Sequence, residues 1–138
     1  MCLRVSTARR PLFTTAYKIL ERQYNMFSQK YEYVTPYLGI AVDLSGKWIT
    51  DERTTLLKYS SGGMNYVDAC YKTGFHSYVR LKDAIEKKRI MSHNAALDMY
   101  ALSLYVFEVD TDDIVEYGVE GRYDVVVSRK IRFVQEII

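Results

Sequence analysis

Several stretches of the chain alternate apolar and polar residues, which is the pattern of strands that bury one face. Residues 14–20 are rich in β-forming side chains and predict a first strand. Residues 31–35 predict a second strand, which stops at Pro36 because proline cannot donate a hydrogen bond within a sheet. The second half of the chain predicts further strands at residues 67–71, 75–78, 104–109, 114–117, 123–127 and 131–137.

A helical repeat is found after the middle of the chain. Apolar residues from Leu81 onward recur at helical spacing with charged residues between them, which predicts a helix over residues 81 to about 90. Asn94 is placed to cap a second short helix over residues 95–99, and a loop over residues 91–102 is the alternative. Phe75 is expected to pack against Ile85, where the preceding strand meets the helix.

Polar segments separate these elements. Residues 50–63 end in a Ser-Ser-Gly-Gly run and predict a flexible loop, and the acidic residues 110–113 predict a turn between two strands. The order of strands, one or two short helices, then strands again predicts an α+β fold with a mainly antiparallel sheet. Residues 1–12 are expected to form a flexible arm, and residues 13–138 a single domain.

The composition narrows the class of protein. The chain has 138 residues, of which 49% are hydrophobic, so it is long enough to bury a core as one domain. Cys2 and Cys70 are too few for a small secreted disulfide scaffold, and neither a secretory leader nor a membrane-spanning run is present, so a cytosolic protein without a membrane partner is expected. The net charge of +2 is too small to indicate nucleic-acid binding by itself.

The segment from Cys70 onward resembles a known group of proteins. It contains Tyr-Lys-Thr-Gly-Phe-His-Ser-Tyr at residues 71–78, then Leu-Lys-Asp-Ala at residues 81–84, and a final stretch that runs from Ser-Arg-Lys-Ile to Glu-Ile at residues 128–137. This combination resembles a family of small bacteriophage and prophage proteins of the gut Bacteroidetes type. The resemblance implies a phage-encoded accessory protein, in the host cell cytoplasm or in the virion, and it brings no activity with it.

Candidate catalytic and metal-binding residues have simpler structural explanations. His76 and Ser77 could act as base and nucleophile, but strand alternation places them on opposite faces. We therefore expect all four motif residues to be structural, namely Gly74, Phe75, His76 and Ser77. The acidic residues 110–113 lack the spacing of a calcium loop and suit a turn, so no metal is expected. No glycine-rich phosphate loop is present, and no cofactor is expected.

One enzymatic alternative stays open. Lys18 on an early strand, the Gly-Phe-His-Ser strand and Glu136 near the last residue resemble the layout of ADP-ribosyltransferase folds. Those enzymes use a basic residue or histidine, a Ser/Thr-rich strand and a catalytic glutamate, and the Ser-Thr-Ser element is replaced here. The chain is therefore expected not to be an enzyme, with a degenerate fold of this type as the alternative.

Tyrosine is the most unusual feature of the composition, with 13 residues in the chain. Four of them in the N-terminal third are candidates for a protein interface, namely Tyr24, Tyr31, Tyr33 and Tyr37. Tyrosine is favoured at interfaces because it offers a large contact area with few rotatable bonds. The sequence therefore predicts a protein that binds a host or phage protein, or itself. The simpler explanation is that these rings furnish half-buried strand faces.

Basic residues in the same region offer an alternative partner. They are Arg9, Arg10, Lys18, Arg22 and Lys30. Aromatic rings can stack on bases while cations neutralise phosphates, so single-stranded nucleic acid is the second hypothesis. Protein binding is preferred because the chain is nearly neutral, and a strong phosphate contribution needs a clear excess of cations.

Overall fold

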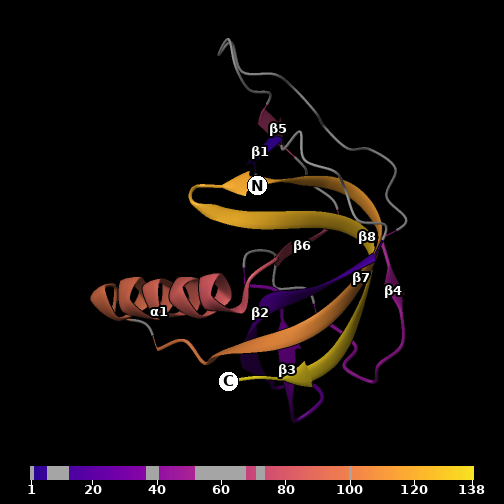
Figure 1. Cartoon of the computed structure of the whole chain (residues 1–138). Helices are drawn as coiled ribbons and strands as arrows, with labels where there is room; N and C mark the ends of the chain where they lie inside the picture. Colours follow the sequence, from indigo (N-terminus) through magenta and orange to yellow (C-terminus); the bar gives the residue numbers. More distant parts are fainter. Residues whose placement is uncertain (1, 6–12, 37–40, 52–67, 71–73, 100) are drawn as a thin grey trace.

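The computed structural model describes residues 2–5, 13–36, 41–51, 68–70, 74–99 and 101–138 (Figure 1). Within these residues the chain forms eight strands and one helix. In chain order they are β1 (Cys2–Val5), β2 (Phe13–Asn25), β3 (Lys30–Val34), β4 (Ile49–Thr50), β5 (Asp68–Cys70), β6 (Phe75–Tyr78), α1 (Leu81–Leu97), β7 (Leu104–Glu120) and β8 (Tyr123–Glu136). The described strand pairings are antiparallel, which confirms the α+β fold with a mainly antiparallel sheet.

The long β7–β8 hairpin organises the sheet. The strand order is β3-β2-β6-β8-β7-β1-β5, with β4 on β8, and β2 also pairs with β7. Strands β2, β7, β8 and β6 therefore form a closed ring of pairings, in which β2 meets β6 at Tyr17 and Tyr78. In Figure 1 the hairpin, drawn in orange and yellow, curves into an arc, and α1 lies at its open side.

The hairpin is longer than the sequence predicted because the acidic residues 110–113 do not form a turn. They continue β7, with register shifts between Glu108 and Val109 and between Ile114 and Glu116. Asp113 takes the left-handed region at φ 52°, which an aspartate tolerates better than most residues. An irregularity of this kind bends a strand without ending it. The prediction of a turn was wrong, and residues 104–117 belong to one strand.

The helix is also longer than predicted. It begins at Leu81 and runs without a break to Leu97, so Asn94 lies inside it and caps nothing. Met91 explains part of this length, because it packs against the buried cluster beneath the helix. The following Ala95 and Ala96 are strong helix formers and extend it further. The prediction of a second short helix was therefore wrong. The loop alternative was wrong for residues 91–97, whereas residues 98–99 and 101–102 do lie outside the helix.

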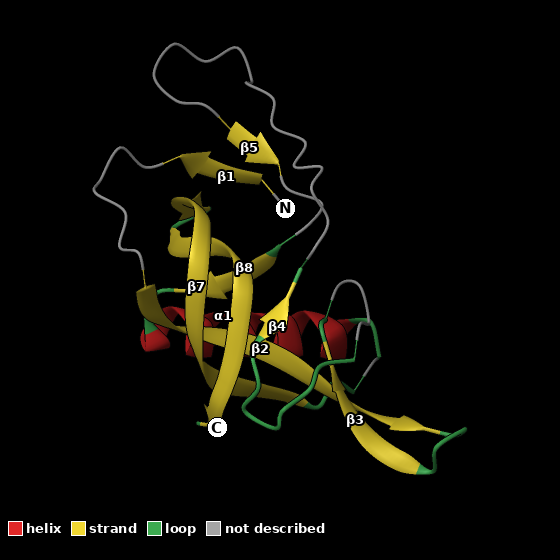
Figure 2. Ribbon diagram, turned by 90° about the vertical axis from the view of Figure 1, so that its right-hand side faces the viewer, coloured by secondary structure: helices red, strands yellow, loops and turns green. Residues whose placement is uncertain are grey.

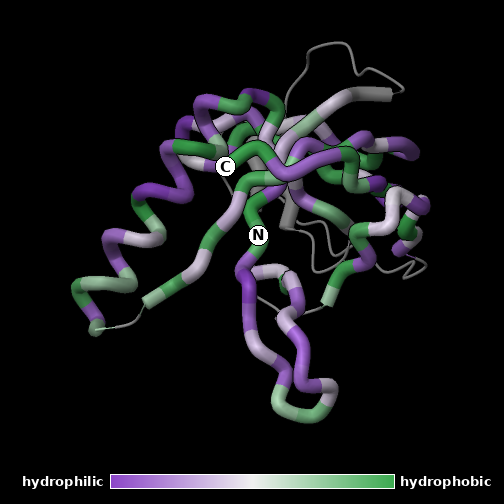
Figure 3. The backbone as a smooth tube through the Cα atoms, turned by 90° about the horizontal axis from the view of Figure 1, so that it is seen from below, coloured by the Kyte–Doolittle hydropathy of each residue, from purple (hydrophilic) through white to green (hydrophobic). Residues whose placement is uncertain are grey.

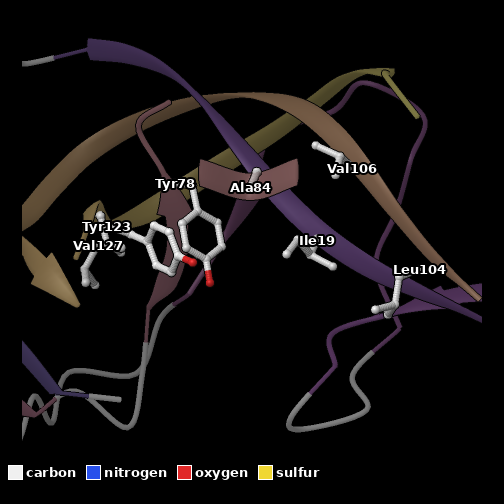
Figure 4. Close-up of a cluster of buried hydrophobic side chains, with 8 residues drawn as sticks. Ile19, Tyr78, Ala84, Leu104, Val106, Tyr123 and Val127 are labelled. Atoms are coloured by element: carbon white, nitrogen blue, oxygen red, sulfur yellow. The ribbon is translucent and has the colours of Figure 1, made fainter. Parts of the chain in front are cut away.

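Two apolar layers hold the fold together, one on each face of the strands. The layer under α1 contains Ala84 from the helix with Ile19 and Tyr78 from the sheet (Figure 4). The opposite layer contains Phe107 and is joined by other side chains, among them Tyr33, Leu44, Ile49 and Phe75.

Phe75 therefore packs on the face of the sheet opposite to the helix. Ile85, its expected partner, is 37% exposed. The predicted contact between Phe75 and Ile85 was wrong. Strand alternation presents Tyr78 to the helix instead.

Part of the predicted N-terminal arm pairs with the sheet. Cys2–Val5 form β1, which pairs with β7 at Arg4 and Val119 and with β5 at Cys2 and Cys70. Residues 6–12 and the Ser-Ser-Gly-Gly run of residues 60–63 lie outside the described residues.

Candidate functional site

A two-stranded ribbon formed by the end of β2 and by β3 extends from the body of the protein. β2 pairs with β7 from Phe13 to Glu21, whereas its last part, from Glu21 to Asn25, pairs with β3. Figure 2 shows this ribbon reaching away from the rest of the sheet at the lower right. Beyond Arg22, whose N–H donates to the carbonyl of Ser103 at 2.8 Å, no described strand other than β3 supports β2.

Large apolar side chains are exposed at the outer end of this ribbon. Tyr24 is 52% exposed, Met26 80%, Phe27 101% and Tyr31 61%. Figure 3 shows the ribbon pointing downward with a hydrophobic tip. Single exposed apolar residues are normal on a protein surface, but several adjacent ones on a projecting element make the ribbon a candidate contact surface.

Asn25 fixes the shape of the tip. Its side-chain oxygen accepts hydrogen bonds from the N–H of Phe27 at 2.9 Å and from that of Ser28 at 3.3 Å. Such Asx turns hold the backbone of a short loop in one conformation. Gln29 completes the reversal at φ 56°. The loop therefore presents Met26 and Phe27 outward from an ordered backbone.

One face of the ribbon is aromatic. The rings of Tyr24 and Tyr31 lie opposite each other, with centroids 5.3 Å apart in an edge-to-face arrangement. The guanidinium of Arg22 lies 4.1 Å from the centre of the Tyr31 ring, which is a cation–π contact. These three side chains keep large areas in solvent while their mutual contacts restrict their rotamers.

Tyr33 anchors the same face to the core. Its ring makes edge-to-face contacts with Tyr105 at 5.7 Å and with Phe107 at 5.2 Å. Phe107 in turn contacts Phe133 at 5.8 Å. Edge-to-face pairs stabilise beyond their buried area, so the base of the ribbon is held firmly.

The other face of the ribbon is polar. Asn25 donates its amide hydrogen to the carboxylate of Glu32 at 2.8 Å, across the two strands. Lys30 lies opposite Asn25 in the register, and Gln23 lies opposite Glu32. The ribbon is thus amphipathic across its thickness, with aromatic side chains on one face and charged or amide side chains on the other.

The predicted interface tyrosines separate into two roles. Tyr24 and Tyr31 are exposed on the ribbon, whereas Tyr33 is half-buried and acts as an anchor. Tyr37 lies outside the described residues. The exposed apolar tip at Met26 and Phe27 was not predicted. Its only sequence signal is the Asn-Met-Phe-Ser-Gln run between two β-forming stretches.

The predicted basic residues do not lie on one surface. Lys18 is buried, and its ammonium donates to the carbonyl of His76 at 2.9 Å. Burial lowers the pKa of Lys18 to about 8. Arg22 and Lys30 are exposed on opposite faces of the ribbon, and Arg9 and Arg10 lie outside the described residues. Lys18 is therefore unavailable for contact with a phosphate.

The Gly-Phe-His-Ser segment is half-buried at residues 74–76 and fully buried at Ser77. Gly74 has φ 88°, a region that favours glycine, and its N–H donates to the carboxylate of Asp51 at 2.6 Å. A Cβ at this position would lie 2.9 Å from the Val127 side chain. Phe75 packs in the core and Ser77 is fully buried. These positions give Gly74, Phe75 and Ser77 a packing role.

His76 is held neutral by its surroundings. Burial, and to a smaller extent the nearby Lys18 ammonium, lower its pKa to about 3. Within the described part of the chain, its Nε2 and the hydroxyl of Ser77 are buried without a hydrogen-bond partner. A general base must exchange protons near neutral pH, so this histidine is poorly suited to that role.

The other candidates for chemistry are also separated. Asp110 pairs with Arg132 at 2.5 Å, and Asp112 accepts a hydrogen bond from the N–H of Asp113. Glu136 lies exposed at the end of β8, opposite Phe107. Among the residues that the structure describes, no group of carboxylates, histidines or cysteines is arranged to hold a metal ion.

Comparison of the chain with known protein families, curated proteins and solved structures identified no relative. In the described part of the chain, no helix has both the length and the apolar character needed to span a bilayer. Functional inference therefore depends on the chemistry of the ribbon.

Proposed function

We propose that this protein acts by binding another protein through the β2–β3 ribbon. The observation that carries the proposal is the exposure of Tyr24, Met26, Phe27 and Tyr31 on one firmly anchored, projecting element. Tyrosine, phenylalanine, methionine and arginine are the residue types enriched in protein interfaces. Arg22 lies among them, over the Tyr31 ring.

The energetics favour a partner that covers the tip. An aromatic or methionine side chain gains about 1.5–3 kcal/mol on full transfer from water to an apolar site. Met26 and Phe27 keep most of their area in solvent, so this energy is left for association. The Asn25 hydrogen bonds order the loop before binding, which lowers the entropic cost of docking.

An accessory role in a bacteriophage is part of the same proposal. The Gly-Phe-His-Ser segment and the final Ser-Arg-Lys-Ile stretch support it through their resemblance to small phage proteins. In that setting the partner is a host or virion protein, or a second copy of the chain. The protein would then reside in the host cell cytoplasm or in the virion.

Single-stranded nucleic acid is a weaker candidate for the same surface. Arg22 over Tyr31 resembles a stacking platform, but the ribbon also carries Glu21 and Glu32, which offset Arg22 and Lys30. Because the charges of the ribbon balance, the release of counterions from nucleic-acid phosphates would contribute little to the binding free energy. Protein binding needs no such excess of cations.

The proposal is tested by competition for a captured partner. The immobilised wild-type chain is incubated with lysate of infected host cells, and bound protein is eluted with excess free chain. Free wild-type chain should compete, as should a control with Leu97→Gln at another exposed apolar position. A double variant with Met26→Ser and Phe27→Ser should fail to compete. Equal competition by the double variant would refute binding through the tip.

A further inference from the structure

Among the residues that the structure describes, none pairs with the outer edge of β3 at Tyr31. β3 is the last strand in the sheet order, with β2 on one side. On its other side the described chain reaches only the end of the strand, where Ala41 bridges Val34 and the N–H of Val42 donates to the carbonyl of Tyr33 at 3.1 Å. An unpaired strand edge is a template for another strand.

The Val42 hydrogen bond shows which backbone groups face this edge. Because the Tyr33 carbonyl points outward, and because strand residues alternate, the N–H and carbonyl of Tyr31 also point outward. Lys30 and Glu32 direct their backbone groups toward β2. Any strand that docks on this edge must therefore form its hydrogen bonds with Tyr31.

We propose that β3 pairs with β3 of a second copy, antiparallel, about a two-fold axis at Tyr31. This inference rests on the proposed function and names the partner as another copy of the chain. An isologous pairing of this kind uses the same strand twice, so the edge must be complementary to itself. The charges and rings of β3 satisfy that requirement.

The charges select one alignment of the two strands. An axis at Glu32 would place the two Glu32 carboxylates directly opposite each other, which is unfavourable. An axis at Tyr33 would centre the second strand on the segment of Ala41 and Val42 that already occupies the edge. An axis at Tyr31 instead places Lys30 opposite Glu32 of the second copy, and does so twice by symmetry. With an axis at Tyr31, only Gln29 of the second copy comes opposite Tyr33, and at Gln29 that copy has already left β3 for its turn.

The geometry strengthens these two ion pairs. With Tyr31 in the hydrogen-bonded position, Lys30 and Glu32 occupy non-hydrogen-bonded positions, where opposing side chains approach most closely. The Asn25 amide already holds the Glu32 carboxylate at 2.8 Å on this face. The lysine of the second copy therefore meets a carboxylate whose rotamer is already restricted.

The aromatic face of the ribbon continues across the same axis. The two Tyr31 rings come opposite each other, and each already contacts its own Tyr24 and Arg22. The pairing thus joins two exposed aromatic patches into one and removes part of each from water. Cross-strand aromatic pairs are among the favourable ones in antiparallel sheets.

Charge reversal tests the proposal, with sedimentation velocity as the readout. Lys30→Glu and Glu32→Lys, each alone, turn both ion pairs into repulsions and should weaken self-association by roughly tenfold. An equimolar mixture of the two variants restores both pairs between unlike chains. The mixture should therefore sediment as a heterodimer, while each variant alone stays monomeric. Circular dichroism of each variant checks that the fold is kept.

A second measurement locates the contact. The Tyr31 amide should exchange its hydrogen more slowly as the protein concentration rises, while the Glu32 amide, which faces β2, should not change. A wild-type chain that is monomeric at every concentration would overturn the inference, as would a mixture that behaves like its separate components. If self-pairing fails in this way, the competition test can still support binding of another protein through the ribbon, provided that the Met26 and Phe27 double variant fails to compete. The self-pairing of β3 and the binding of a protein through the tip can therefore be refuted independently.

Discussion

Two phenylalanines in this chain occupy opposite environments, and their replacement by alanine should separate stability from function. Phe107 is 5% exposed and contacts the rings of Tyr33 and Phe133, whereas Phe27 lies fully in solvent at the tip of the ribbon. The same atoms are removed in both variants. Any difference between them therefore reports on the surroundings of each ring.

The expected magnitudes differ widely. Truncation of a buried phenylalanine costs about 3–5 kcal/mol, and the loss of two edge-to-face contacts places Phe107→Ala toward the upper end. A domain of this size would lose about 10–20 °C in melting temperature. Phe27→Ala removes no packing, so its effect should stay within about 0.5 kcal/mol.

Thermal and urea unfolding, followed by circular dichroism, measure both effects. The protein is kept dilute so that self-association does not add to the stability. Equal destabilisation by the two substitutions would refute the reasoning, because it would mean that the Phe27 ring packs against the body in solution. A stable Phe107→Ala variant would show that the contact between Phe107 and Tyr33 does not anchor the ribbon.

Two further predictions concern the interior. The pKa of His76 is lowered from 6.5 to about 3 in the folded state, so between these pH values the folded state binds fewer protons than the unfolded state. The free energy of unfolding should therefore fall as the pH drops from about 6.5 toward 3, by up to about 1.4 kcal/mol per pH unit. Urea unfolding across this range should show a flatter profile for His76→Gln, and identical profiles would contradict the buried neutral imidazole. Gly74→Ala should destabilise by about 1–3 kcal/mol, since its φ of 88° is strained for alanine and the new Cβ meets Val127. Gly121→Ala, at φ 61° with open space around it, is the matched control and should cost less.

The sequence predicted elements where the pattern is local. The β-forming residues of 14–20 and the alternation in residues 31–35 were enough to place two strands. The spacing from Leu81 was enough to place the start of the helix. These signals depend on which residues face the core within a few positions. The α+β class followed from their order along the chain.

Features that depend on distant contacts were missed. Residues 110–113 include residues typical of turns. Asp110, Thr111 and Asp112 nevertheless pair with β8 on one side and β2 on the other, which keeps this stretch in a strand. The exposure of Phe27 follows from the point at which β7 stops supporting β2, near Glu21. Nothing in the neighbouring residues encodes that point.

The candidate site was predicted in part for the same reason. Tyrosine content alone pointed to the N-terminal third, but it could not separate Tyr24 and Tyr31, which lie on the free ribbon, from Tyr33, which lies over Phe107. Lys18 belonged to the predicted basic group and is buried. The position of Lys18 on β2 directs its side chain inward, and its ammonium donates a hydrogen bond to the carbonyl of His76 on β6. The sequence could not predict this contact because His76 lies 58 residues further along the chain.

The central claim is that the ribbon tip contacts a protein, and site-specific photo-crosslinking tests it most directly. A photoreactive phenylalanine analogue is placed at position 27 and, as a control, at position 97, which is also exposed and apolar. In cells that produce the labelled chain, irradiation should give a discrete protein adduct from position 27 and none from position 97. Excess unlabelled wild-type chain should suppress this adduct. Equal labelling from both positions, or no adduct from position 27, would contradict the account.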